Sequence, residues 1–190
     1  MNLDDLKTEL TNNSITDVIN KHILGGNPIC FSGNLELIME LKKALSDHFN
    51  IHMKNIEIVG SAKLGVSLSI ERFGQSYNEK SDIDMVLVSS ELFDLAWHDL
   101  LKLDFSYHKL TKKDRESLKE CYDTIHRGFI SPDKLPPSSS FTKNWWTVFS
   151  SLSNREKYEY RKVRGRLFKN WWFVEKYYSI QLVKLSKSEE

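Results

Sequence analysis

The segment SDIDMVLVSS, residues 81–90, places the strongest constraint on the fold of this chain. Its side chains alternate with the period of two that is typical of a β-strand, so Ile83 and Met85 share one face. Asp82 and Asp84 share the other face, about 7 Å apart. Two carboxylates this close repel each other, and a hard cation such as Mg²⁺ or Mn²⁺ relieves the repulsion. The segment therefore predicts either a metal site or a strand end whose aspartates cap turns or face solvent.

A second motif, IVGSAKLG, precedes this strand. A short run of β-branched residues stops at Gly60 and Ser61, which predicts a buried strand that enters a tight turn. Gly60 permits close approach of the backbone, the N–H groups of such a turn suit a phosphate, and Ser61 adds a hydroxyl. Lys63 is a further candidate for contact with a triphosphate. The alternative is a turn that only connects two strands, with Lys63 in solvent.

The rest of the chain alternates between helical and extended patterns. Apolar residues recur at three- and four-residue steps after residues 35 and 90 and again from about 155 to 185, which predicts three helices. A more polar helix is expected near 111–125, and a loop over SPDKLPPSSSF. Short apolar runs predict strands at IEIVGS, GVSLSI and SDIDMVLVSS. The order predicts an α/β (α+β) fold with a small mixed sheet flanked by helices.

Length supports one folding unit. The 190 residues, 40% of them hydrophobic, suffice for one ordinary core, so we expect a single domain over 1–190. Within it, we expect the core at 35–100 and a mainly helical part at 111–190.

Charge is unevenly distributed, although the whole chain has a formal charge of only +1. Residues 155–190 hold ten Lys or Arg and five Glu, so the predicted C-terminal helix is basic as well as aromatic. On it Lys162, Arg166 and Lys169 would share a face, with Arg161 adding to the density. This face predicts contact with RNA or another phosphate, and the alternative is a solvated face that complements the acidic remainder.

Cysteines, termini and aromatic pairs indicate the setting. Cys30 and Cys121 form no metal-binding or disulfide pattern, and the N-terminus lacks the basic and apolar segments of a secretory signal. A cytoplasmic protein without a membrane span is expected. Trp145–Trp146, Trp171–Trp172 and Tyr177–Tyr178 are neighbours that cannot share one helix face, so one of each pair is expected at an interface with a partner protein or a second copy, or stacked on bases.

Together, the Gly-Ser turn and the SDIDMVLV strand resemble the nucleotidyltransferase superfamily, the DNA polymerase beta-like fold, over roughly residues 35–100. The resemblance implies that Gly60 and Ser61 hold nucleotide phosphates and that Asp82 and Asp84 bind catalytic Mg²⁺. It implies transfer of a nucleoside monophosphate from a nucleoside triphosphate such as ATP to a hydroxyl of an RNA or protein acceptor, with release of pyrophosphate. Small members of this superfamily suggest a toxin–antitoxin or antiviral defence setting.

One part of that pattern is missing from the sequence. The superfamily has a third carboxylate on a later neighbouring strand, and no apolar strand carrying an acid is evident after Ser90. Asp104 and Asp133 are the candidates, and each also suits a helix end or a turn. The alternative function is therefore a catalytically degenerate module that binds nucleotide or a partner protein.

Overall fold

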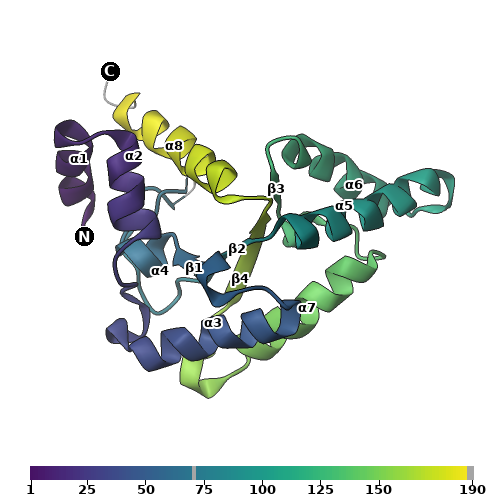
Figure 1. Ribbon diagram of the computed structural model, residues 1–190, viewed down its shortest axis with the longest axis horizontal. Helices are drawn as coiled ribbons and strands as arrows, with labels where there is room; N and C mark the ends of the chain where they lie inside the picture. Colours follow the sequence, from purple (N-terminus) through teal and green to yellow (C-terminus); the bar gives the residue numbers. More distant parts are fainter. Residues whose placement is uncertain (70–71, 188–190) are drawn as a thin grey trace.

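A four-stranded mixed sheet forms the centre of the computed structural model, which describes residues 1–69 and 72–187 (Figure 1). The strand order is β1-β2-β4-β3. β2 runs antiparallel to β1 and parallel to β4, and β3 is antiparallel to β4. The strands are β1 (Ile56–Val59), β2 (Ile83–Val88), β3 (Phe129–Ile130) and β4 (Val163–Phe168). The predicted mixed α/β architecture is confirmed.

Helices cover both faces of the sheet (Figure 1). On one face pack α3 (Leu35–Phe49), α5 (Ser90–Phe105), α6 (Lys112–Ile125) and α7 (Ser140–Ser153). On the other pack α1 (Leu3–Asn12), α2 (Ile15–Val18), a π-helical turn (Ile19–Leu24), the short α4 (Ser61–Leu64) and α8 (Trp171–Lys187). Short 3₁₀ turns connect these elements at Cys30–Gly33, Met53–Asn55, Tyr107–Lys109, Pro132–Lys134 and Glu156–Tyr158.

The alternation read in β2 creates two separate cores. Ile83, Met85 and Leu87 are buried with α3, α5 and α7, whereas Val86 and Val88 are buried with α8 and the N-terminal helices. Asp84 has the same parity as Val86 and therefore faces the α8 side. The predicted helices after residues 35 and 90 and near 111–125 are confirmed, and Ser89 and Thr111 cap the latter two through their side chains.

The predicted strand at GVSLSI is wrong. Its described residues make one isolated bridge, between Val66 and Ser76, and the last residue of the segment lies outside the described part. The amide of Ser67 donates to the carbonyl of Gln75, and the amide of Tyr77 donates to that of Gly65. The segment therefore pairs with its own loop rather than with the sheet.

The single helix predicted from about 155 to 185 is also wrong. The first part is β4, and only the second part is helical, as α8. β4 is extended because every residue from Val163 to Phe168 pairs with β2. Asn170 then marks the start of α8, since its side chain accepts from the amide of Phe173. The predicted helical stripe holds for Val174, Tyr178 and Leu182, which are buried.

Gly165 in β4 tests how tightly α7 packs on the sheet. A Cβ at this position would lie 2.3 Å from Cζ of Phe149 and 2.6 Å from Cζ2 of Trp145. We expect Gly165→Ala to lower the free energy of unfolding by about 1–3 kcal/mol, as overpacking does. Urea denaturation measures this loss. Ala in place of the exposed Lys162 is the control, and an equal loss there would contradict the packing argument.

Candidate functional site

A polar cavity of about 540 Å³ brings the predicted residues together. Its wall includes Gly60 and Ser61 from the turn after β1, and Asp82 and Asp84 from the start of β2. These two segments are neighbours because β1 pairs antiparallel with β2, which sets Val59 opposite Asp84. The turn and the aspartates, read as separate motifs in the sequence, therefore form one site.

The backbone at Gly60 explains why a glycine stands there. Its φ of +65° and ψ of −150° are not open to residues with a side chain, and this conformation starts α4. A Cβ would also lie 3.1 Å from Oδ2 of Asp84. The turn thus passes directly against the carboxylate.

The two aspartates have different surroundings. Burial raises the pKa of Asp84 above its ordinary value, and the Arg166 guanidinium opposes this shift. The Oδ2 atom of Asp82 lies 3.1 Å from Nε of Arg164 in an ion pair whose side chains are partly exposed. Each carboxylate is therefore accompanied by a cationic side chain from β4.

The basic residues of β4 are the main feature that sequence reasoning missed at this site. In the parallel register Arg164 stands beside Asp84, and Arg166 beside Val86. The superfamily pattern expects an acid on a neighbouring strand, and this neighbouring strand carries two arginines. The signal was present in VRGRLF, where basic and small or apolar residues alternate with the period of a strand.

Arg166 is held in place from several sides. Its Nε donates to Oγ of Ser131 over 3.2 Å. Its guanidinium carbon lies 4.5 Å from the centre of the Tyr177 ring and 5.5 Å from that of Phe129. A guanidinium fixed by stacking keeps donors free for an anion at little further loss of side-chain entropy. Arg72 and Lys80 also line the cavity, and neither is ion-paired with another described residue.

The two candidates for a third carboxylate separate clearly. Asp133 follows β3 and lines the cavity with Asp82 and Asp84. Asp104 lies near the end of α5. Burial is the main cause that raises the pKa of Tyr122 to about 12, and the contact of Tyr122 with Asp104 is the second. Among the described residues, no three acidic, His or Cys side chains are close enough together to hold a metal ion.

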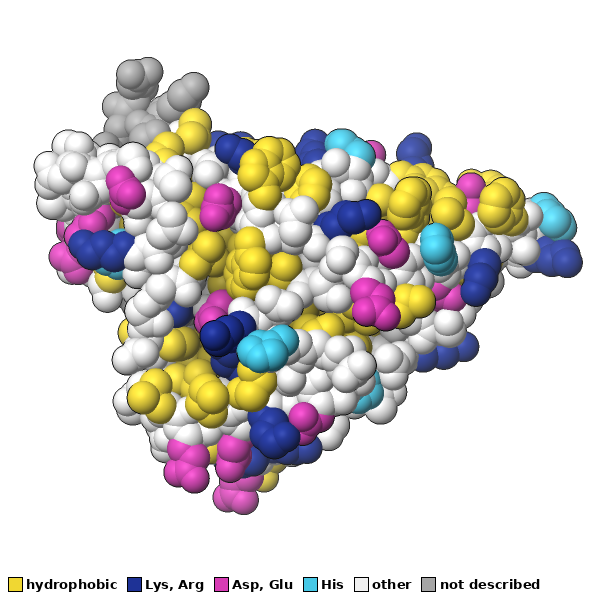
Figure 2. Space-filling view, viewed as in Figure 1, with side chains coloured by type: hydrophobic (Ala, Val, Ile, Leu, Met, Phe, Trp, Pro, Cys, Tyr) yellow, Lys and Arg dark blue, Asp and Glu magenta, His cyan; other side chains and the backbone are white. Residues whose placement is uncertain are grey.

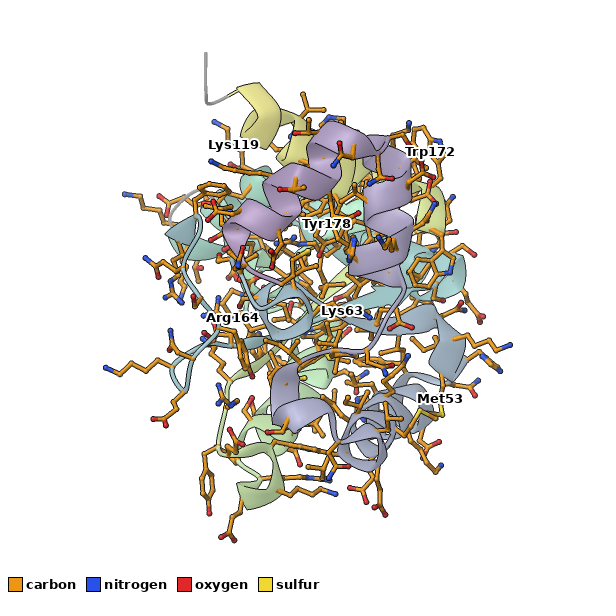
Figure 3. All side chains as sticks on the ribbon, turned by 90° about the vertical axis from the view of Figure 1, so that its left-hand side faces the viewer. Met53, Lys63, Lys119, Arg164, Trp172 and Tyr178 are labelled. Carbon is orange, nitrogen blue, oxygen red and sulfur yellow. The ribbon has the colours of Figure 1, made fainter. Side chains whose placement is uncertain are left out.

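Lys63 does not reach the cavity. It is buried, and its Nζ donates to the carbonyl of Gly26 over 2.6 Å (Figure 3). Burial lowers its pKa. The lysine therefore ties α4 to the loop after the π-helical turn.

The predicted basic helix face does not exist, because its residues lie on and around β4. Arg161 pairs with Glu159 and donates to the carbonyl of Asn78, and Lys169 pairs with Asp94. Lys162 is exposed just before β4. On the face seen in Figure 2, basic and acidic side chains are scattered rather than gathered in one patch.

The members of the aromatic pairs differ in burial, and the interface or stacking role predicted for one of each pair stays a prediction. Trp145 is buried and stacks on Phe149, whereas Trp146 is only partly buried, and both line the cavity. Trp172 is exposed, and Tyr178 is buried under the N-terminal helices (Figure 3). Burial raises the pKa of Cys30 to about 11 and that of Cys121 to about 12, so both remain protonated at neutral pH.

No family model, curated protein or solved structure matches this chain. Within residues 1–69 and 72–187, none of the helices combines the length and the apolar character that crossing a bilayer requires.

Replacing Lys63 tests whether it contacts a phosphate. Because its Nζ is turned to Gly26, we expect Lys63→Met to change the nucleotide affinity that the resemblance implies by no more than about twofold. Isothermal titration with Mg²⁺ and ATP measures this, and a thermal melt reports the separate effect on folding. A tenfold or greater loss of nucleotide affinity in a variant that still folds would show that Lys63 contacts the ligand.

Proposed function

We propose that this chain binds a nucleoside triphosphate together with Mg²⁺ in the polar cavity. The observation that carries this proposal is the convergence of the Gly60–Ser61 turn, the Asp82/Asp84 pair and two arginines of β4 in one wall. The cavity volume of about 540 Å³ lies in the range of small-molecule sites, which is about 300–1,000 Å³. A polyphosphate with its cation suits this mixture of charges better than an apolar ligand does.

The residues divide between the two parts of this ligand. Asp82 and Asp84 offer carboxylate oxygens, the ligands that Mg²⁺ prefers, and phosphate oxygens and water would complete its shell. Arg166, already oriented by Tyr177 and Ser131, suits a phosphate through its remaining N–H groups. The backbone at Gly60 leaves room for a phosphate to approach Asp84 without a side chain between them. When bound, Mg²⁺ would neutralise the charge that the two carboxylates and the phosphates bring together.

Binding without catalysis is the function that this geometry favours. A two-metal transfer site uses several carboxylates to hold its ions, and the strand beside β2 supplies Arg164 and Arg166 instead. The module is then a degenerate relative of the nucleotidyltransferases that it resembles.

Asn variants of the aspartates test this proposal. We expect Asp82→Asn and Asp84→Asn to lower the affinity for ATP in Mg²⁺ by tenfold or more, and to leave the affinity in EDTA unchanged or higher. Because the raised pKa of Asp84 means that its charged form destabilises the fold, Asp84→Asn should also be more stable at neutral pH. That advantage should grow as pH rises from the ordinary carboxyl pKa through the raised one. Calorimetry and thermal melts measure both effects.

Asp47→Asn is the matched control, because Asp47 is an exposed carboxylate paired with Lys43 on α3. It should leave nucleotide binding unchanged. Wild-type affinity for Mg²⁺ and ATP in both cavity variants would overturn the proposed function.

Nucleotidyl transfer is the second candidate, and the position of Asp133 in the cavity wall favours it. In this reaction an acceptor hydroxyl oxygen bonds to the α-phosphorus while the bond to the pyrophosphate oxygen breaks, and a cavity carboxylate takes the hydroxyl proton. Asp133 lies in the 3₁₀ turn Pro132–Lys134 rather than on a strand, and it lines the same cavity.

Incubation with α-labelled nucleoside triphosphates, Mg²⁺ and cellular RNA or protein tests the second candidate. Transfer is expected to leave label in one acceptor class with the wild type and to fall at least a hundredfold with Asp133→Asn. Asp104→Asn is the control and should keep full activity, because Asp104 is not part of the cavity wall. If the wild type binds nucleotide but transfers no label to RNA or protein, the transfer function is wrong and nucleotide binding without catalysis remains.

A further inference from the structure

We infer that Arg164 is an internal competitor of the metal ion, so that this cavity accepts a divalent cation only in the company of a polyphosphate. The inference rests on the proposed function and assigns a positioning role to a residue that neither the Gly-Ser turn nor the aspartate motif contains. In the free protein the cation that neutralises Asp82 is the guanidinium of Arg164. In the complex, a phosphate takes over Arg164, and Asp82 becomes available to Mg²⁺.

The contact between the two side chains has the features of an exchangeable pair. Nε of Arg164 lies 3.1 Å from Oδ2 of Asp82, yet this N–H is not directed at any acceptor among the described residues. The Arg164 side chain as a whole is 42% exposed, although its Nε atom is buried, so a ligand in the cavity can reach part of this side chain. An ion pair of this kind contributes little to folding, and its loss carries a small free-energy penalty.

Arg166 provides the contrast within the same strand. Its guanidinium contacts the rings of Tyr177 and Phe129 and is hydrogen-bonded to Ser131, so it cannot follow a ligand without breaking those contacts. Arg164 has no ring contact among the described residues. β4 therefore presents one fixed and one movable guanidinium at the same cavity.

The backbone limits where Arg164 can go. Its Cα is the register partner of Asp84, and its side chain emerges on the face that carries the aspartates. Arg164 lines the same cavity as Gly60 and Ser61, so the site at which it would meet a phosphate lies within the cavity that also holds Asp82. A phosphate in the cavity can accept two parallel hydrogen bonds from the planar guanidinium of Arg164. The contact with Asp82 is weaker, because the Nε–H of Arg164 is not directed at the carboxylate.

This exchange makes metal and phosphate binding mutually dependent. The free cation must displace a guanidinium from Asp82, whereas the cation that arrives with a polyphosphate finds Arg164 already engaged by that phosphate. Each ligand then raises the affinity for the other by the same factor, as thermodynamic linkage requires. A nucleoside or a monophosphate, with fewer anionic oxygens to offer, should release Asp82 less well than ATP does.

Arg164→Gln tests the inference through two affinities that should move in opposite directions. Titration with Mn²⁺, followed by the electron paramagnetic resonance of the free ion, should show an affinity without nucleotide at least threefold higher than in the wild type. Calorimetry should show an affinity for ATP in Mg²⁺ about tenfold lower, as expected for the loss of a charged hydrogen bond to phosphate. The factor by which ATP strengthens Mn²⁺ binding should therefore shrink.

Lys80→Gln is the matched control, because it removes one positive charge from the same cavity without an ion pair to either aspartate. It should weaken ATP binding and leave Mn²⁺ affinity within twofold of the wild type. Arg164→Lys keeps the charge but loses the planar fork, so its coupling factor should fall between those of the wild type and Arg164→Gln. This second variant also serves if the Gln variant does not fold.

The outcomes separate this inference from the proposed function. If the wild type shows ATP and Mn²⁺ binding that depends on Asp82 and Asp84, but Arg164→Gln leaves their coupling factor unchanged, the competitor role is wrong and the binding function stands. The same holds if Lys80→Gln raises the Mn²⁺ affinity as much as Arg164→Gln does. If nucleotide binding is indifferent to both aspartates, the proposed function itself fails.

Discussion

The parallel pairing of β2 with β4 is the interaction on which both the fold and the cavity depend. Six consecutive residues of each strand are in register, and this pairing separates the two cores that the helices complete. It also sets Arg164 beside Asp84 near the N-terminal ends of the two strands. Without β4, β2 would pair with β1 only. The two aspartates would then lie side by side with no positive charge from the same sheet.

Electrostatics explain why acidic and basic side chains meet at this point. A buried carboxylate is unfavourable unless a positive charge or hydrogen bonds accompany it, and the raised pKa of Asp84 shows that its compensation is incomplete. The arginines of β4 supply part of that compensation within the protein itself. Under the proposed function, an added cation would supply the remaining compensation, and the phosphates that it brings would engage the displaced Arg164.

Local pattern predicted the elements whose residues act within their own segment. The alternation in β2 and the glycine needed at a positive φ gave the aspartate face and the Gly60 turn, because both depend on backbone geometry within a few residues. The resemblance to nucleotidyltransferases remains a prediction that no comparison supports, and the structure brings its four residues into one cavity. The helices that begin after residues 35 and 90 were equally readable from their apolar steps.

Long-range pairing decided the features that local pattern missed. Val163 and Leu167 are spaced as on a helix, while VRGRLF also alternates as a strand does, and only contact with β2 selects the second pattern. The sequence offered Lys63 either to a triphosphate or to solvent, because the carbonyl that accepts from its Nζ belongs to a loop far earlier in the chain. Asp133 reaches the cavity because β3 pairs with the end of β4. The spacing of residues in the sequence does not predict this contact.

The order of β2 and β4 along the chain has a consequence for how this protein folds. Three long helices, α5, α6 and α7, and the short strand β3 lie between these two strands in sequence, so a large loop must close before they can pair. A growing chain that has made β2 holds a complete aspartate motif but no arginine beside it until the last strand has emerged and docked. Under the proposed function, ligand binding at this site would therefore report completion of the whole sheet, and a bound nucleotide would selectively stabilise fully folded molecules over every partly formed one.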